Sequence, residues 1–183
     1  MATNTNDLLI QNNNFSRIVF VKTKVGYNLF IKYFNKYNKI KLDTTPVLVP
    51  FGIEEYNGKD IVNLRLNSND NNSYNFVCDI RAIDKFFINL KQTDNKYWNI
   101  VQNDIKNKEY VSCLKDDNVI LLRTHIKKTK HTIMSTFFED GVEINPFKIK
   151  SRTGIFSIEV GQLWFNDTNY GLILYLNGGK ICN

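Results

Sequence analysis

Alanine is almost absent from this 183-residue sequence, which has it only at Ala2 and Ala82. An all-helical bundle normally fills its exposed positions with alanine and other strong helix formers, so that class is disfavoured. The chain is instead rich in aromatic residues, with 13 Phe and 9 Tyr, and in Ile and Val. These residue types favour strands, and we expect a mainly β protein.

Long apolar runs are also missing, and none approaches the roughly 20 residues that a membrane-spanning helix needs. The polar segment Met1–Asn14 lacks the basic and apolar regions of a signal peptide. The three cysteines, Cys78, Cys113 and Cys182, are odd in number and far apart, which does not favour a disulfide framework. We therefore expect an intracellular protein with no membrane partner.

Motifs of catalytic sites are scarce. The sequence has no phosphate-binding glycine loop, no nucleophile elbow and no paired Glu/Asp motif. His125 and His131 are the only histidines, and no cysteine or carboxylate lies near them at metal-ligand spacing. We expect no enzymatic activity, cofactor or metal site. A nuclease or an enzyme accessory stays an alternative that would need carboxylates converging in space.

Short apolar, β-branched or aromatic segments follow one another along the chain and predict strands. The predicted strands are 15–21, 26–34, 39–42, 47–53, 61–66, 74–77, 119–126, 132–138, 142–149, 155–165 and 170–176. Residues 27–37 could also form a helix, but their aromatic and β-branched content favours a strand. Turns are expected at Asn57-Gly58, Asp140-Gly141, Thr153-Gly154, Asn166-Asp167 and Asn177-Gly178-Gly179.

One segment has helical periodicity. From Asp79 to Thr93, four apolar residues recur at spacings of three and four and predict an amphipathic helix with Asp79 as its N-cap. A shorter helix is predicted over 97–105, with Trp98 and Val101 facing inward. After a flexible leader at residues 1–14, residues 15–183 are expected to form one domain. A closed antiparallel barrel with an inserted helix would hide the edges of so many short strands.

Acidic residues are missing from one long segment. Residues 8–42 hold seven Lys or Arg and no Asp or Glu, and residues 121–152 hold seven basic against three acidic residues. The part between them, residues 54–117, is slightly acidic, with nine basic and eleven acidic residues. The net charge of +6 is therefore concentrated on two β segments that flank a helical middle.

Aromatic residues alternate with lysines in the first basic segment. Lysines and exposed rings together hold single-stranded nucleic acid, because the ammonium groups bind phosphates while the rings stack on bases. The simpler interpretation is that the rings fill the core and the lysines form the solvent face of a strand. The second basic cluster, 123–131, leaves a strand for a loop, where small barrels often contact oligonucleotides.

In the segment Leu42-Asp-Thr-Thr-Pro46-Val-Leu-Val-Pro50-Phe-Gly52-Ile53, a Thr-Pro element leads into a Pro-Phe-Gly-Ile run. Trp98 follows the Phe-rich helix, and Trp164-Phe165 is followed by a polar turn and Tyr170-Gly171. These three features resemble the OB-fold single-stranded DNA-binding proteins of large double-stranded DNA viruses. The resemblance covers about residues 15–182 and implies an OB-like barrel that coats exposed DNA in viral replication, recombination or repair, in the host cytoplasm or nucleus.

We therefore predict a sequence-independent single-stranded DNA-binding protein without enzymatic activity. The predicted phosphate contacts are Lys22, Lys24, Lys32, Lys36, Arg123, Lys127, Lys128 and Lys130. The predicted stacking residues are Tyr33, Tyr37, Phe137 and Trp164, of which Trp164 could equally belong to the core. RNA as ligand, a homo-oligomer and replication proteins are further expected partners. The main alternative is a viral structural or interaction protein with a β-sandwich fold and no nucleic-acid role.

Overall fold

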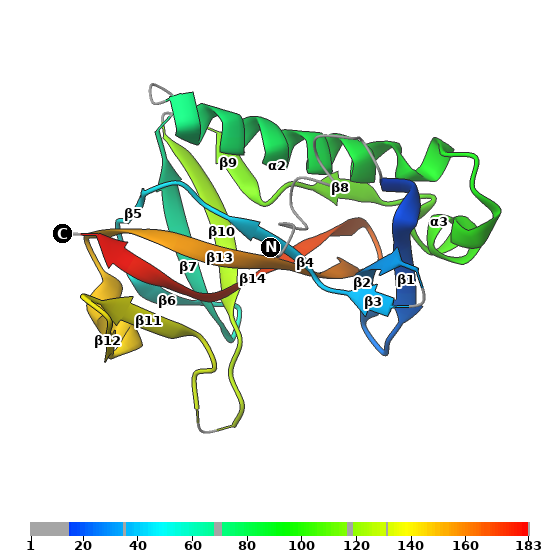
Figure 1. Ribbon diagram of the computed structural model, residues 1–183. Coiled ribbons are helices and arrows are strands. Elements are labelled where there is room, and N and C mark those ends of the chain that lie inside the picture. Colours follow the sequence, from blue (N-terminus) through cyan, green and yellow to red (C-terminus); the bar gives the residue numbers. More distant parts are fainter. Residues whose placement is uncertain (1–14, 35, 68–70, 117–118, 131, 183) are drawn as a thin grey trace.

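Five strands pair in a closed ring (Figure 1). The computed structural model describes residues 15–34, 36–67, 71–116, 119–130 and 132–182. The ring follows the order β5, β7, β10, β14, β13 and back to β5, in which β10 and β14 are parallel and the other pairs are antiparallel. The five strands are β5 (Val47–Val49), β7 (Lys59–Leu66), β10 (Ile120–Ile126), β13 (Arg152–Phe165) and β14 (Asn169–Cys182).

Numbered along the chain, these five strands follow one another around the barrel as 1-2-3-5-4-1. This Greek-key order in a five-stranded barrel is that of the OB fold. The predicted OB-like β-barrel with an inserted helix is therefore confirmed, with one parallel pair, β10 and β14, among the expected antiparallel ones. The β-sandwich of the alternative hypothesis is not the fold of the described residues, because their barrel strands close on one another.

Shorter strands extend the barrel. We call the antiparallel strands β1 to β3 the wing (residues 18–38); its β2 pairs with β13 at Gln162–Trp164. The strands of the wing are β1 (Ile18–Lys22), β2 (Gly26–Tyr33) and β3 (Lys36–Asn38). The other short strands are β4 (Ile40–Asp43), β6 (Ile53–Tyr56), β8 (Glu109–Val111), β9 (Leu114–Asp116), β11 (Thr136–Glu139) and β12 (Val142–Ile144). The strand interpretation of residues 27–33 is thus confirmed over the helical one.

The long helix α2 (Asn71–Asn89) lies between β7 and β10 in the sequence and crosses the barrel end in Figure 1. It begins earlier than predicted, so the expected strand 74–77 and the N-cap role of Asp79 are both wrong. The physical reason is that Phe76 and Val77 are buried and continue the helical spacing of Ile80 and Ile83. The remaining helices are η1 (Phe15–Arg17), η2 (Leu90–Gln92), η3 (Lys96–Trp98), α3 (Asn99–Ile105) and η4 (Pro146–Ile149).

The core is one continuous cluster of buried side chains that joins the inside of the barrel to the apolar face of α2. Trp98 and Val101 belong to it, as the sequence predicts for the second helix. The indole Nε1 of Trp98 donates a hydrogen bond to the Ile18 carbonyl, 3.0 Å away. This bond fixes the wing to the helical segment, because a buried N–H group needs an acceptor.

In the part of the chain that the structure describes, no helix has the length and apolar character needed to cross a membrane. The predicted leader, residues 1–14, lies outside the described residues. The division into a leader and one domain stays a prediction.

Candidate nucleic-acid interface

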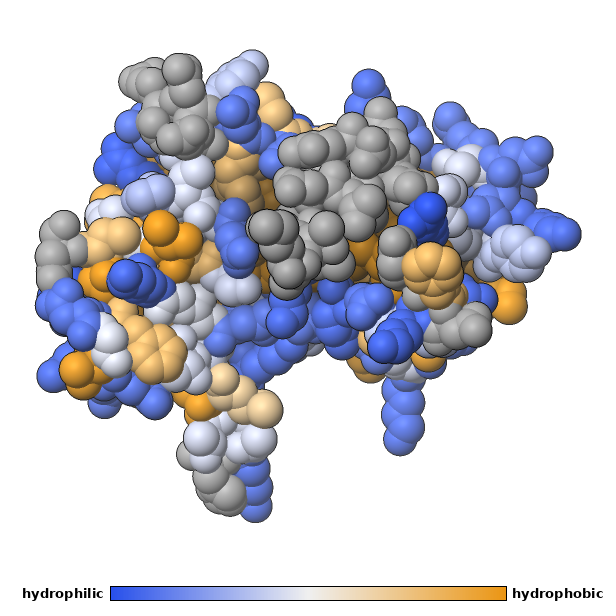
Figure 2. All heavy atoms as spheres, in the orientation of Figure 1, coloured by the Kyte–Doolittle hydropathy of each residue, from blue (hydrophilic) through white to orange (hydrophobic). Residues whose placement is uncertain are grey.

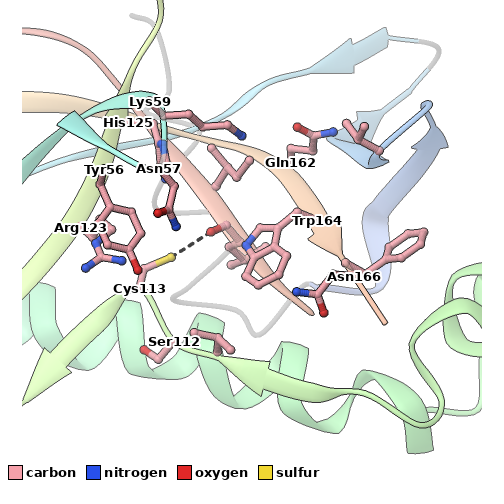
Figure 3. Close-up of a pocket in the computed structure, with 15 residues that line it drawn as sticks. Tyr56, Asn57, Lys59, Ser112, Cys113, Arg123, His125, Gln162, Trp164 and Asn166 are labelled. Atoms are coloured by element: carbon pink, nitrogen blue, oxygen red, sulfur yellow. Dashed lines mark hydrogen bonds between the residues drawn. The ribbon is translucent and has the colours of Figure 1, made fainter. Parts of the chain in front are cut away.

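A groove crosses the outer face of the barrel from β7 and β10 to β13 and β14. It consists of two adjoining hollows of about 480 and 430 Å³, which share Lys59, His125 and Ile173 in their walls. We call the two together the barrel groove. Figure 3 shows the first hollow, with Tyr56 and Arg123 on one side and Trp164 on the other.

Local sequence explains how the first wall forms. Asn57 and Gly58 both have positive φ, 51° and 71°, and make the tight turn between β6 and β7 that the sequence predicts. Tyr56 and Lys59 are paired across this turn and therefore project beside the groove. On β10, Arg123 and His125 alternate with the buried residues Leu122, Thr124 and Ile126 and so face outward.

Arg123 and Tyr56 form a cation–π pair in this wall. The guanidinium carbon of Arg123 lies 4.3 Å from the ring centroid of Tyr56, whose side chain is 46% exposed. Within the described residues, the buried Nε of Arg123 has no hydrogen-bond acceptor. The pair therefore presents a positive charge and an accessible ring together at the groove.

Trp164 forms the opposite wall, and a glycine allows its position. It is paired with Gly171 across β13 and β14, and a Cβ at Gly171 would lie 3.1 Å from two atoms of the indole ring. The indole thus packs directly over the Gly171 backbone. The predicted residue Trp164 is half-buried and lines the groove, so one side of its ring is held by the sheet.

Tyr175 has an equivalent position in the second hollow. A Cβ at Gly161 would lie 2.3 Å from the Tyr175 ring, so only glycine lets the ring approach this closely. The Nζ of Lys127 lies 5.0 Å from the centroid of the same ring. Burial and, to a lesser extent, Glu159 raise the pKa of Tyr175.

A buried carboxylate holds two lysines at the groove. Glu159 is 5% exposed, and its two oxygens lie 2.6 Å from Nζ of Lys127 and 3.1 Å from Nζ of Lys39. Burial raises the pKa of Glu159, but the hydrogen bonds and charges of the two lysines outweigh it, so the pKa is lowered overall. The carboxylate is therefore charged at neutral pH and opposes part of the positive charge of the groove.

The basic segment after β10 lies along the rim of the second hollow. Lys128 pairs with Asp60 at 2.8 Å, while Lys130 is exposed farther out in the same connection. In Figure 2 two projections extend below the body, at the places that the β10–β11 connection and the β1–β2 turn have in Figure 1, and the surface between them is largely hydrophilic. The groove is bounded by residues of both, Lys128 and Val25.

His125 is uncharged at neutral pH. Burial, followed by the nearby charges of Lys59 and Arg123, lowers its pKa to about 4. The imidazole therefore adds no positive charge to the groove at pH 7 but can donate or accept hydrogen bonds.

The structure does not bring the other predicted residues to the barrel groove. Lys22 pairs with Asp104 at 3.0 Å, at the end of β1, and Lys24 is exposed in the β1–β2 turn. These two lysines and the remaining ones all lie on the wing, and for Tyr33 only the backbone, in β2, is described. The exposed wing residues among the predicted set are Lys32, Lys36 and Tyr37.

Phe137 is not accessible for stacking, contrary to the sequence prediction. Its side chain is 0% exposed and packs edge-on against Phe156, with the ring centroids 6.3 Å apart. The reason is the alternation of β11, in which Phe137 faces inward and its neighbour Phe138 is 40% exposed. Phe137 is therefore removed from the candidate interface.

Several groove residues were missed by sequence reasoning. Tyr56 and Lys59 flank the Asn57-Gly58 turn, a signal that could have identified them as a ring and a cation at a hairpin tip. Tyr175 was not identifiable, because its accessibility depends on Gly161 of a different strand. Among the described residues, no three His, Cys, Asp or Glu side chains are placed to hold a metal ion.

No family model and no curated protein matches the sequence. Solved structures of single-stranded DNA-binding proteins are similar. The gp2.5 protein encoded by bacteriophage T7 is 13% identical with a TM-score of 0.51, over 78% of this chain and 86% of that chain. The single-stranded DNA-binding protein from bacteriophage Enc34 is 12% identical with a TM-score of 0.49, over 90% of this chain and 88% of that chain. The structure of the Enc34 protein in complex with single-stranded DNA is 13% identical with a TM-score of 0.47, over 91% of this chain and 96% of that chain. At this identity, the likeness to gp2.5 shows a shared fold.

Proposed function

We propose that this protein binds single-stranded DNA in the barrel groove, without sequence preference. The observation that carries the proposal is the position of the groove. OB barrels bind oligonucleotides on the face of their second and third strands and at the loops 1–2 and 4–5. In this chain those strands are β7 and β10, and both loops contribute to the groove wall, through Asn57 and Asn166.

The side chains of the groove suit both parts of a nucleotide. Lys59, Arg123 and Lys127 supply positive charge for phosphates, and the rings of Tyr56 and Trp164 supply surfaces for bases. Base stacking on aromatic residues contributes about 1–3 kcal/mol per base and tolerates any sequence. The similarity in fold to gp2.5, a single-stranded DNA-binding protein, agrees with this assignment.

The proposed role is that of a non-enzymatic coat for exposed strands. Because three features of the sequence resemble proteins of large DNA viruses, we place this role in viral replication, recombination or repair, in the host cytoplasm or nucleus. Binding of RNA, self-association and contacts with replication proteins are parts of the proposal that need their own measurements.

Fluorescence anisotropy with labelled single-stranded and duplex DNA, over a series of salt concentrations, tests the proposal. We expect preference for single strands and a steep salt dependence. In the triple variant Lys127→Glu, Lys128→Glu and Lys130→Glu, the slope of log affinity against log salt should become shallower by about 1.4 to 2. About 0.7 is lost per phosphate contact, and the contact of Lys127 counts only in part because Glu159 already pairs with it.

A matched control is available on another face. Changing Lys148, Lys150 and Lys180 to glutamate alters the net charge equally, and all three lysines are exposed outside the barrel groove. Equal weakening by both triple variants would indicate a general charge effect and contradict the groove. Absence of binding by the unmodified protein at about 50 mM salt would contradict the function itself.

A further inference from the structure

A separate hollow lies on the wing and is not part of the barrel groove. It measures about 780 Å³ and is formed by the wing together with η1 and η3. We call it the wing hollow and define it by Arg17, Lys32, Phe34, Tyr37, Tyr97 and Trp98. We propose that the wing hollow binds a further segment of the same single strand, an inference that rests on the proposed function of the barrel groove.

Three aromatic rings of the wing hollow are unusually accessible. Phe34 is 82% exposed, Tyr97 is 81% exposed and Tyr37 is 58% exposed, although they come from two separate segments of the chain. Scattered exposed rings need no explanation, but several around one hollow indicate a binding surface. Phe34 also has a φ of 51°, a conformation in which a small turn residue would be favoured over a large ring.

The charge of the wing identifies the class of ligand. Arg17 and Lys32 line the hollow, and the Nζ of Lys96 lies 5.2 Å from the ring centroid of Tyr97. Within the described residues 15–34 and 36–42 there is no acidic residue. An apolar protein partner would gain nothing from so many cations, whereas a strand of nucleic acid needs both cations and rings.

A row of contacts connects the wing hollow with the barrel groove. Lys39 lines the groove, and its Nζ lies 4.6 Å from the ring centroid of Phe30. The Phe30 ring is next to Tyr37, with centroids 6.4 Å apart, and Tyr37 lines the wing hollow. Along β2 the distance from Asn28 in the groove to Lys32 in the hollow is about 13 Å, a few nucleotides.

The test compares oligothymidylates of about 6 and about 16 nucleotides, the range of OB-fold site sizes. Tyr37→Ala with Tyr97→Ala should weaken binding of the long oligonucleotide about tenfold or more and leave the short one unchanged. Lys32→Glu with Lys36→Glu should lower the salt slope for the long oligonucleotide only, by about 1 to 2. Both tyrosines are exposed, so their replacement is expected to leave the fold intact.

The control is Tyr74→Ala with Phe147→Ala, two residues that are 51% and 65% exposed on α2 and η4. This variant should bind both oligonucleotides as the unmodified protein does. Unchanged binding of the long oligonucleotide by the tyrosine variant overturns the wing site while leaving the barrel groove in place. If the tyrosine variant changes its mass in sedimentation while its DNA affinity is unchanged, the wing site is also overturned. The wing hollow would then be a contact between two copies of this protein. Failure of the unmodified protein to bind either oligonucleotide overturns both proposals.

Discussion

Two glycines determine which rings the barrel groove presents. Gly161 and Gly171 lie on neighbouring strands, and each lies under the ring of an aromatic residue, Tyr175 and Trp164 respectively. A side chain at Gly161 would displace the Tyr175 ring. One at Gly171 would press on the indole of Trp164 and lie 2.6 Å from the carbonyl oxygen of Val111. At the residue scale, the candidate interface therefore depends on these two glycines as well as on the lysines and aromatic residues.

His125 gives a prediction about pH at the same scale. Its pKa is about 4 in the folded protein and 6.5 ordinarily, so between these values the unfolded chain binds the proton that the folded one excludes. Stability should therefore fall as the pH decreases from 6.5 to 4.5. We expect the free energy of unfolding to fall by about 1–2 kcal/mol over this interval. One titrating group can contribute at most about 1.4 kcal/mol per pH unit, and the expected loss is smaller than this because the ring is partly open to solvent.

Urea unfolding of the unmodified protein and of His125→Asn at pH 6.5 and 4.5 measures this effect. The variant should lose less stability than the unmodified protein over the same pH interval, because it lacks the titrating ring. The variant of the other histidine, His131→Asn, is the matched control. If both histidine variants retain the full pH dependence, carboxylates cause it and the assignment to His125 is wrong.

At the scale of elements, one of the links that attach α2 to the neighbouring strands is the buried carboxylate of Asp84. Asp84 is 8% exposed and accepts hydrogen bonds from the hydroxyls of Tyr110 and Ser112, on and directly after β8. Burial raises the pKa of Asp84, although the two hydroxyls act in the opposite direction. The helix is thereby fixed to the segment that leads to Cys113 in the groove wall.

Replacing Asp84 by alanine should lower the free energy of unfolding by about 2–4 kcal/mol. Two hydrogen bonds are lost, and the Tyr110 hydroxyl is left in a buried position without its acceptor. Chemical denaturation measures the change, with Lys85→Ala at an exposed position of the same helix as control. A loss below about 0.5 kcal/mol would mean that the network contributes nothing to the attachment of α2.

Elements with a strong local signal were predictable from the sequence. The Asn57-Gly58 and Asp140-Gly141 turns and the helical 97–105 segment follow from residues adjacent in the chain. Asn177-Gly178-Gly179 carries the same signal, yet it lies inside β14. A Cβ at Gly178 would lie 2.0 Å from the carbonyl oxygen of Thr136, so this glycine serves a contact between strands. Such contacts depend on register and topology, which local sequence does not encode.

The same limit applied to the candidate site. Arg123, Lys127, Lys128 and Trp164 were predicted from charge and aromatic content, and the structure brings them to one groove. Phe137 has the same composition signal but faces the core, because the alternation of β11 turns Phe137 inward and Phe138 outward. Composition thus identified the basic segments, and the fold determined which side chains share a surface.

At the scale of the whole molecule, part of the positive charge of the barrel groove is balanced by the buried carboxylate of Glu159. Glu159 binds Lys127 and Lys39, two cations that line the barrel groove. Its lowered pKa means that this pairing stabilises the fold at pH values above the ordinary 4.5, and that the contribution is lost as the pH falls through the lower, folded pKa. At neutral pH the carboxylate therefore competes with the proposed ligand for both lysines.

Glu159→Gln should consequently strengthen binding of single-stranded DNA while it weakens the fold. With one negative charge removed and two lysines released, the slope of log affinity against log salt should become steeper by about 0.7 to 1.4, corresponding to one or two additional phosphate contacts. Anisotropy titrations over a salt series measure the slope, and thermal unfolding confirms that the variant is folded. Glu143→Gln, at an exposed position of β12, changes the net charge equally and should leave the slope unaltered. A steeper slope in both variants would reflect net charge alone, and an unchanged slope in Glu159→Gln would mean that Glu159 does not compete with the strand for Lys127 and Lys39.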